Sequence, residues 1–361
     1  MEQDRAITTN APFGGVSLRK VEREAPADGQ ALLSTVETGI CGTDRGIVSG
    51  ALGFSYNPAG RDYMVLGHEC IARVASADGE GLRKGDYVVP ATRSGGGCLN
   101  CLVGRPDNCS DNDRHDAGVT GKDGFMRDSF VYSTSDLVKV NDESVADVAV
   151  LTEPMKNVMK VFDSLSHITK LSVYHGKDGT LRSRRALVVG TGCEGFLFSM
   201  MASDAGYITQ IVNRHDISER QKRILDTFDV DFADYSRPGA LQGEGVDLLV
   251  DTSGDPAALL GMLRHVRPNG VGVCFGTNEN VAPASMSGGD IINIVEKNIV
   301  VLGSVDGSKK HYMDAVRQLS AWRKCRPDAM KQMITGRFRP ENTGILLARQ
   351  PGEIKSVISW Q

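Results

Sequence analysis

The chain lacks any apolar run long enough to cross a lipid bilayer, and its first residues lack the apolar core of a secretion signal. It also lacks an excess of positive charge. The formal net charge is −4, which argues against general attraction to nucleic acid or anionic membranes. There is no internal repeat and no low-complexity segment. These absences predict a cytoplasmic protein that binds neither nucleic acid nor membrane.

The remaining composition is that of a globular protein. The chain has 361 residues, 40% hydrophobic and 24% charged, and this length favours two domains over one. It contains eight cysteines. A disulfide framework is not expected in a reducing cytoplasm, so the cysteines gathered between positions 98 and 109 are metal-binding, redox-active or incidental.

The pattern of apolar residues changes along the chain. The first third resembles short strands separated by glycine-rich turns, which predicts an irregular β-rich domain. From 186 onward strands alternate with helices, which predicts a parallel, doubly wound sheet. The segment 353–360 is expected to be a strand that returns to the first domain. The predicted α/β organisation is a catalytic domain over 1–185, a dinucleotide-binding domain over 186–306, and a return to the catalytic domain over 307–361.

A glycine fingerprint follows the apolar strand predicted at 186–189. Gly190 allows a tight turn, Gly192 lets the backbone approach a pyrophosphate, and Gly195 lets the next helix pack on the strand. The amino end of that helix offers free N–H groups to the phosphates. The strand–glycine–helix order therefore predicts a dinucleotide site.

The end of the second predicted strand indicates which dinucleotide is bound. NAD sites usually carry an acidic residue there, but this chain has Asn213, Arg214 and His215. An arginine can pair with a 2′-phosphate, and no acid is present to repel it. We therefore expect NADP to be preferred, with NAD possible because Asn213 can still bind a ribose hydroxyl.

Two groups of residues are candidates for zinc. Cys41, His68 and Glu69 supply sulfur, nitrogen and oxygen ligands, and Glu153 is a further candidate for the same ion. Adjacent residues of a strand point in opposite directions, so His68 and Glu69 are not both expected to bind at once. The second group, a candidate structural zinc site, consists of Cys98, Cys101 and Cys109 with Asp113 favoured as fourth ligand, the alternative being a reduced, metal-free loop.

Several short segments resemble one known family when taken together. They are Gly39–Asp44, Leu66–Glu69, Cys98–Arg105, Asp123–Arg127, Leu151–Pro154 and the Asn-Arg-His at 213–215. Over essentially the whole chain they resemble the zinc-dependent medium-chain alcohol and polyol dehydrogenases, and more closely the archaeal glucose 1-dehydrogenases. The resemblance implies a GroES-like catalytic domain, a Rossmann domain and a dimer or tetramer.

The resemblance also implies roles for individual residues. Cys41, His68, Glu69 and Glu153 would surround the catalytic zinc, with Glu69 or Glu153 assisting proton transfer. Thr43 would touch the reacting oxygen. Sugar contacts would come from Asp116, Glu153, Asn157 and Asp306, and the cofactor-facing loops would include Thr252, Gly276, Thr277, Asn278, Ser304 and Asp306.

The chain departs from the family pattern in two places. The family's structural zinc uses four cysteines, and the first is replaced here by a glycine at 95 or 96. Asp116 stands where the family has a longer glutamate. The predicted activity is oxidation of an aldose, glucose or galactose, at C1 to the lactone. The alternatives are a zinc dehydrogenase for a polyol or threonine, and a non-catalytic NADP-binding protein of the same fold.

Overall fold

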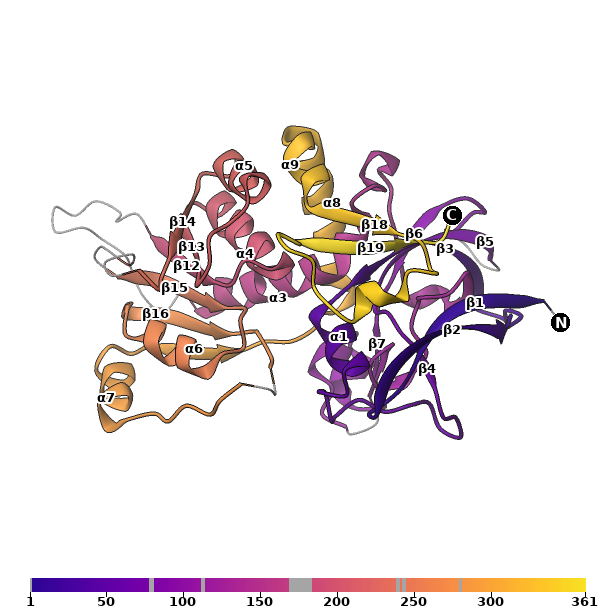
Figure 1. Cartoon of the computed structure of the whole chain (residues 1–361), viewed down its shortest axis with the longest axis horizontal. Coiled ribbons are helices and arrows are strands. Elements are labelled where there is room, and N and C mark those ends of the chain that lie inside the picture. Colours follow the sequence, from indigo (N-terminus) through magenta and orange to yellow (C-terminus); the bar gives the residue numbers. More distant parts are fainter. Residues whose placement is uncertain are drawn as a thin grey trace. The chain divides into compact units, whose positions relative to one another are not determined.

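The computed structural model describes residues 2–77, 81–111, 114–168, 184–237, 241, 245–278 and 281–361. The chain forms two compact units, one made of Met1–Lys156 and Asp306–Gln361 and the other of Asn157–Val305 (Figure 1). The first division falls inside helix α3 (Thr152–Ile168), whereas the sequence-based boundary stands at 185. Among the described residues, no helix is both long and apolar enough to span a lipid bilayer.

The first unit is built on β-sheets. The largest has the order β11-β6-β5-β3-β19-β18, with β10 paired to β3, and smaller sheets have the orders β2-β1-β4 and β7-β8-β9. Strand β3 alternates between buried and half-buried residues because one of its faces packs on the core. The strands are β1 (Gln3–Asn10), β2 (Gly14–Glu22), β3 (Gln30–Ile40), β4 (Met64–Val65), β5 (Glu69–Ala77), β6 (Tyr87–Pro90), β7 (Arg93–Ser94), β8 (His115–Ala117), β9 (Gly121–Lys122), β10 (Ser129–Ser133), β11 (Leu137–Lys139), β18 (Ile334–Phe338) and β19 (Lys355–Ser359).

The helices of this unit flank the sheets. A buried cluster that includes Ile7, Met64 and Ile358 and a second that includes Leu33, Phe125 and Phe130 form its core. Strand β19 pairs antiparallel with β3, and the end of the chain lies in the same unit as its beginning. Besides the first turn of α3, the helices are α1 (Gly42–Val48), α2 (Leu99–Leu102), α8 (Lys309–Cys325) and α9 (Pro327–Gln332).

The second unit contains one six-stranded sheet in the order β14-β13-β12-β15-β16-β17, with every pair parallel. This is the strand order of a doubly wound dinucleotide-binding fold, so that prediction is confirmed. Strand β12 is buried along 186–189 because helices cover both faces of such a sheet. The strands are β12 (Arg185–Val189), β13 (Ile208–Asn213), β14 (Val230–Asp234), β15 (Val246–Asp251), β16 (Val266–Cys274) and β17 (Val300–Gly303), and the helices are α4 (Cys193–Asp204), α5 (Glu219–Thr227), α6 (Pro256–Leu263) and α7 (Gly288–Glu296).

One boundary in this unit differs from the sequence pattern. The apolar pattern of the sequence predicts a helix over 256–266 and a strand over 270–276, but α6 ends at Leu263 and β16 begins at Val266. The turn-like Pro-Asn-Gly at 268–270 lies inside β16 as an irregularity, with Asn269 at a φ of 63°. Turn residues within a strand produce the same local pattern as a turn between two elements, which explains the error.

Candidate active site and cofactor-binding loop

The first candidate metal group forms where two segments of the first unit meet. Cys41 follows the end of β3 and caps α1, and its backbone N–H donates to the Asp44 carboxylate at 2.8 Å. His68 follows Gly67, whose φ of 90° suits glycine. One ligand atom each from Cys41, His68 and Glu69 lies within 4.8 Å of the others. His68 precedes β5, so strand alternation does not separate it from Glu69, and that the two do not both bind at once stays a prediction.

Asp44 orients the histidine of this group. Its carboxylate Oδ1 lies 3.4 Å from His68 Nδ1, and neither atom has a closer polar partner within the described part of the chain. Burial by itself lowers the pKa of His68, but the Asp44 carboxylate and the Cys41 thiol raise it well above its usual value. A carboxylate behind a histidine is the usual second partner of a zinc ligand, and it leaves the other ring nitrogen for the metal. The donor set and this orientation fit a catalytic zinc.

Glu69 is held by a buried lysine. Lys355 Nζ on β19 donates to the two carboxylate oxygens of Glu69 at 2.5 and 2.7 Å, and both side chains are almost fully buried. A Cβ on Gly39 would lie 1.9 Å from Glu69 Oε2, so glycine is required for this close approach. The predicted ligand Glu69 therefore has a second possible role as the counter-ion of Lys355.

The predicted sugar-binding acids belong to one chain of alternating charges. Arg93 donates from Nε and Nη2 to the two carboxylate oxygens of Asp116, at 2.7 and 2.9 Å. Its Nε also lies 2.9 Å from Asp306, which forms a further ion pair with Lys156. Lys156 lies 2.9 Å from Glu153, one turn earlier on α3. Burial raises the pKa of Asp306, but Lys156 and Arg93 together hold it below its usual value.

Sequence reasoning missed both cations of this chain. Arg93 and Lys156 carry no motif signal, and only strand register and helix spacing bring them to the acids. Glu153 lies outside the group formed by Cys41, His68 and Glu69. Thr43 lies on α1 with its hydroxyl 3.8 Å from the Cys41 sulfur, next to the candidate zinc site.

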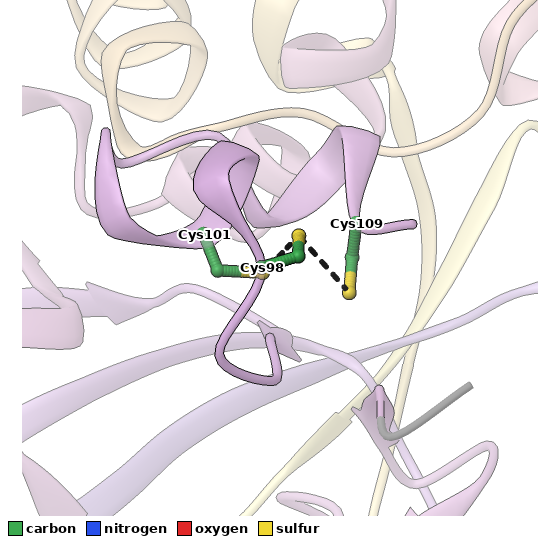
Figure 2. A group of neighbouring side chains, drawn as sticks. All are labelled: Cys98, Cys101 and Cys109. Carbon is green, nitrogen blue, oxygen red and sulfur yellow. Dashed lines mark hydrogen bonds between the residues drawn. The ribbon is translucent and has the colours of Figure 1, made fainter. Parts of the chain in front are cut away.

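The second candidate metal group is a compact set of three thiols (Figure 2). Cys98 Sγ lies 3.5 Å from Cys101 Sγ and 4.0 Å from Cys109 Sγ. A Cβ on Gly95 would lie 2.3 Å from the Cys101 sulfur, so Gly95 lies directly against the thiol group. Asp113, predicted as fourth ligand, lies outside the described residues.

The three thiols differ in acidity, which predicts selective alkylation of the metal-free protein. Hydrogen bonds from the Ser110 side chain, and then from backbone N–H groups, lower the pKa of Cys98 to about 6. Burial and the neighbouring thiols raise the pKa of Cys101 to about 12. Because the thiolate is the nucleophile, iodoacetamide should label Cys98 first, with a rate that rises through about pH 6.

Peptide mass spectrometry over a pH series would measure this labelling, with the exposed Cys325 as reference thiol. Added zinc should suppress labelling in the group and leave Cys325 unaffected. Equal rates at Cys98 and Cys101 would contradict the assignment.

The glycine fingerprint of the second unit forms the tight turn and the helix start that are expected of a dinucleotide-binding loop. Gly190 has a φ of 105°, and Gly192 caps α4, which begins at Cys193. A Cβ on Gly195 would lie 1.9 Å from the Gly190 carbonyl oxygen, so only glycine allows this contact between helix and loop. The open amino end of α4 fits a pyrophosphate.

The residues after β13 are already engaged with neighbours in this unit. Asn213 Nδ2 donates to the Thr191 hydroxyl at 2.7 Å. Arg214 Nε donates to the Tyr235 hydroxyl at 2.7 Å, and its guanidinium pairs with Asp255 while remaining half exposed. The sequence did not indicate Asp255 or Tyr235 as partners. This half-exposed guanidinium fits the 2′-phosphate of NADP. Asp255 would compete with that phosphate for the guanidinium.

Other predicted cofactor residues have mainly local roles in the same unit. The Thr252 hydroxyl donates to the Val189 carbonyl at 2.7 Å, and a Cβ on Gly276 would lie 2.3 Å from the Gly254 nitrogen. These contacts shape the loops beyond β12, β15 and β16. The buried Ser304 hydroxyl has no hydrogen-bond partner among the described residues. His215 is exposed, Asn157 is buried, and Thr277 and Asn278 lie in the loop after β16.

Two family profiles match the chain. One is described as the glucose dehydrogenase C-terminus and covers residues 146–360, and the other is the alcohol dehydrogenase GroES-like domain over residues 27–142. The chain belongs to the glucose dehydrogenase family. The recognition and the two-part fold class predicted from the sequence are therefore confirmed.

Relatives of this family match the chain along its whole length. The glucose 1-dehydrogenase of Thermoplasma acidophilum is 47% identical over 364 aligned residues, with 100% of both chains covered. That of Metallosphaera sedula is 36% identical, covering 99% of this chain and 98% of the relative. The structure of the Haloferax mediterranei glucose dehydrogenase in complex with NADP, zinc and gluconolactone has a TM-score of 0.87 at 24% identity, with 99% of each chain covered.

Proposed function

We propose that this chain is a zinc-dependent glucose 1-dehydrogenase that oxidises C1 of the sugar to the lactone with NADP as the preferred acceptor. The observation that carries the proposal is the 47% identity, over the full length, to a glucose 1-dehydrogenase in a chain that also brings Cys41, His68 and Glu69 together. When bound, zinc would polarise the substrate oxygen and the nicotinamide would accept the hydride.

The protein's own residues supply binding and proton handling. The Thr43 hydroxyl, beside Cys41, is placed to accept the proton of the substrate hydroxyl and pass it on. Asp116 and Asp306 offer carboxylate oxygens to sugar hydroxyls, and Asn157 offers an amide. Buried hydroxyls without partners weaken binding, so a set of acceptors favours a sugar over a simple alcohol.

The test is NADP reduction, followed by absorbance, by the purified protein with glucose, galactose, xylose, sorbitol, threonine and ethanol. Each substrate is assayed with and without a zinc chelator. We expect chelator-sensitive turnover with glucose. Turnover with sorbitol or threonine alone would replace the substrate assignment, and no turnover with any substrate would favour a non-catalytic NADP-binding protein.

Arg214 is proposed to read the 2′-phosphate of NADP. Arg214→Ala should weaken NADP binding by about 1.5–3 kcal/mol, the range for hydrogen bonds to charged groups, or about 10–150-fold in Kd. NAD binding should change little, because NAD lacks that phosphate. Fluorescence titration with both dinucleotides measures the difference.

Arg264→Ala is the matched control, since Arg264 is an exposed arginine of the same unit that pairs with Asp290. It should leave the binding of both dinucleotides unchanged. An equal loss of NADP and NAD affinity in Arg214→Ala would show that Arg214 does not read the phosphate.

We propose a homo-oligomer that forms through the second unit. Strand β17 lies at one end of the six-stranded sheet, and its Val301 is 47% exposed. On α7, Ile292 and Val295 are 62% and 64% exposed. An open strand beside exposed apolar residues is suited to pairing with a second copy.

Val301→Lys should therefore reduce the mass measured by light scattering to that of a smaller species. Phe13→Lys, at an exposed apolar residue of the first unit, should not. A mass unchanged by Val301→Lys would place the interface elsewhere.

A cytoplasmic location is part of the same proposal. Six of the eight cysteines, Cys41, Cys98, Cys101, Cys109, Cys193 and Cys274, lie in the two candidate metal groups or in the second-unit core and loops. A reducing compartment keeps such thiols available as metal ligands.

A further inference from the structure

Arg93 is the centre of the charge chain in the first unit. Its side chain is 8% exposed, and it contacts two acids that the sequence predicts as sugar ligands, Asp116 and Asp306. Beyond Asp306 the chain of charges continues through Lys156 to Glu153. Arg93 and Lys156, joined by Asp306, therefore connect Asp116, which is expected to bind sugar hydroxyls, with Glu153, which is expected near the metal.

Several contacts hold Arg93 in one orientation. It lies on β7 directly opposite Asp116 on β8, so strand register places the two side chains together. The preceding residue, Thr92, is fixed by its backbone N–H and its hydroxyl, each 3.1 Å from the buried Tyr312 hydroxyl. Asp306 is held in a left-handed conformation, with φ of 60°, while it forms its ion pairs. The guanidinium thus reaches its acids without the usual freedom of an arginine side chain.

The Nη1 group of Arg93 takes no part in these ion pairs. Nε and Nη2 contact the two acids, but Nη1 is buried and has no hydrogen-bond partner among the residues that the structure describes. A buried guanidinium N–H without an acceptor is unfavourable, so this position is expected to receive one. Asp116 likewise keeps acceptor capacity, because a carboxylate has about four lone-pair positions and Arg93 occupies two of them. The Arg93–Asp116 pair therefore keeps one unused donor, Arg93 Nη1, and unused acceptor positions on the Asp116 carboxylate.

We propose that Arg93 is a specificity-determining residue that donates from Nη1 to a sugar oxygen while the paired Asp116 accepts from a neighbouring hydroxyl. The substrate class is then an aldose with two adjacent free hydroxyls next to the reacting carbon. This inference rests on the proposed sugar dehydrogenase activity and adds the group that recognises the substrate. Asp306 contacts Arg93 Nε and is itself paired with Lys156, so this ion pair also helps to position the guanidinium.

The test compares Arg93→Lys with the unchanged protein on glucose, 2-deoxyglucose and 3-deoxyglucose. Lysine keeps the charge but cannot form the bidentate pair and the third contact together. We expect kcat/KM for glucose to fall about 10–100-fold, mainly through KM, as for the loss of a hydrogen bond from a charged group. The loss should shrink to less than about threefold for the deoxy sugar that lacks the contacted oxygen.

Arg323→Lys is the matched control. Arg323 forms the same bidentate arrangement with Asp147 at 3.1 and 3.0 Å, in the same unit but outside the charge chain. It should leave kcat/KM unchanged for every sugar. An equal fold-loss for Arg93→Lys on all three sugars would show that Arg93 only braces Asp116, and would overturn the proposal.

A second measurement does not depend on the folding of a variant. In a crystal structure of the unchanged protein with zinc and glucose, Arg93 Nη1 should lie about 3 Å from a sugar oxygen adjacent to the hydroxyl bound by Asp116. An Nη1 that contacts only water or protein in that complex would overturn the inference. Failure of the wider functional proposal looks different, because the unchanged protein would then not oxidise glucose at all.

Discussion

Replacing Lys355 with methionine should lower the free energy of unfolding by about 3–5 kcal/mol, the usual cost of breaking a buried ion pair on one side. Lys355 is the cation that Glu69 contacts through both oxygens, and the side chains are 2% and 0% exposed. Without it, the carboxylate of Glu69 would be buried without this counter-ion. Urea denaturation of the metal-free protein, followed by circular dichroism, measures the change.

Two further variants make this result interpretable. The double variant Lys355→Met with Glu69→Gln should regain most of the lost stability, because the buried charge is removed. Lys310→Met removes a lysine that is 63% exposed and pairs with Asp314, and should cost less than about 0.5 kcal/mol. If Lys355→Met were as stable as the unchanged protein, the pair would not contribute to the fold as we infer.

Replacing His68 with alanine should lower kcat for glucose by at least about a thousandfold. His68 is the proposed nitrogen ligand in the candidate metal group with Cys41 and Glu69, and its Nδ1 lies 3.4 Å from the Asp44 carboxylate. A catalytic metal contributes several kcal/mol to transition-state stabilisation, and about 4 kcal/mol corresponds to this factor. Initial rates and the metal content by mass spectrometry, measured on the same samples, test the expectation.

The matched control is His167→Ala, at an exposed histidine on α3. It should leave both the rate and the zinc content unchanged. Full activity in His68→Ala would show that the Cys41–His68–Glu69 group takes no part in the reaction. Full activity together with the loss of one zinc would assign a structural role to that ion.

The two-part fold was predictable because its signals are local. Strand β12 is continuously apolar and leads directly into Gly190, Gly192 and Gly195, and each of these features acts over neighbouring residues. The same holds for Cys98 and Cys101, three residues apart across a single turn. Where a local signal was ambiguous, as at the Pro-Asn-Gly within β16, the predicted boundary was wrong.

The partners of the charged residues were not predictable. Lys355 is 286 residues from Glu69, and Arg214 is 41 residues from Asp255. No sequence motif predicts such pairs, because the two residues of each pair meet only when the strands and loops that carry them pack together. The argument from strand alternation for His68 and Glu69 assumed a strand that includes both, whereas β5 begins only at Glu69.

The sequence by itself determined the family, the Rossmann fold with its glycine loop, and the residue types that can bind zinc and a dinucleotide phosphate. These features depend on the identity of residues that are close together in the sequence, so they can be recognised without the tertiary structure. Only the tertiary structure decided that Arg93 joins Asp116 to Asp306 and that Lys355 holds Glu69. A buried charge requires an opposite charge nearby in space, and nearness in space is set by the packing of strands far apart in the chain.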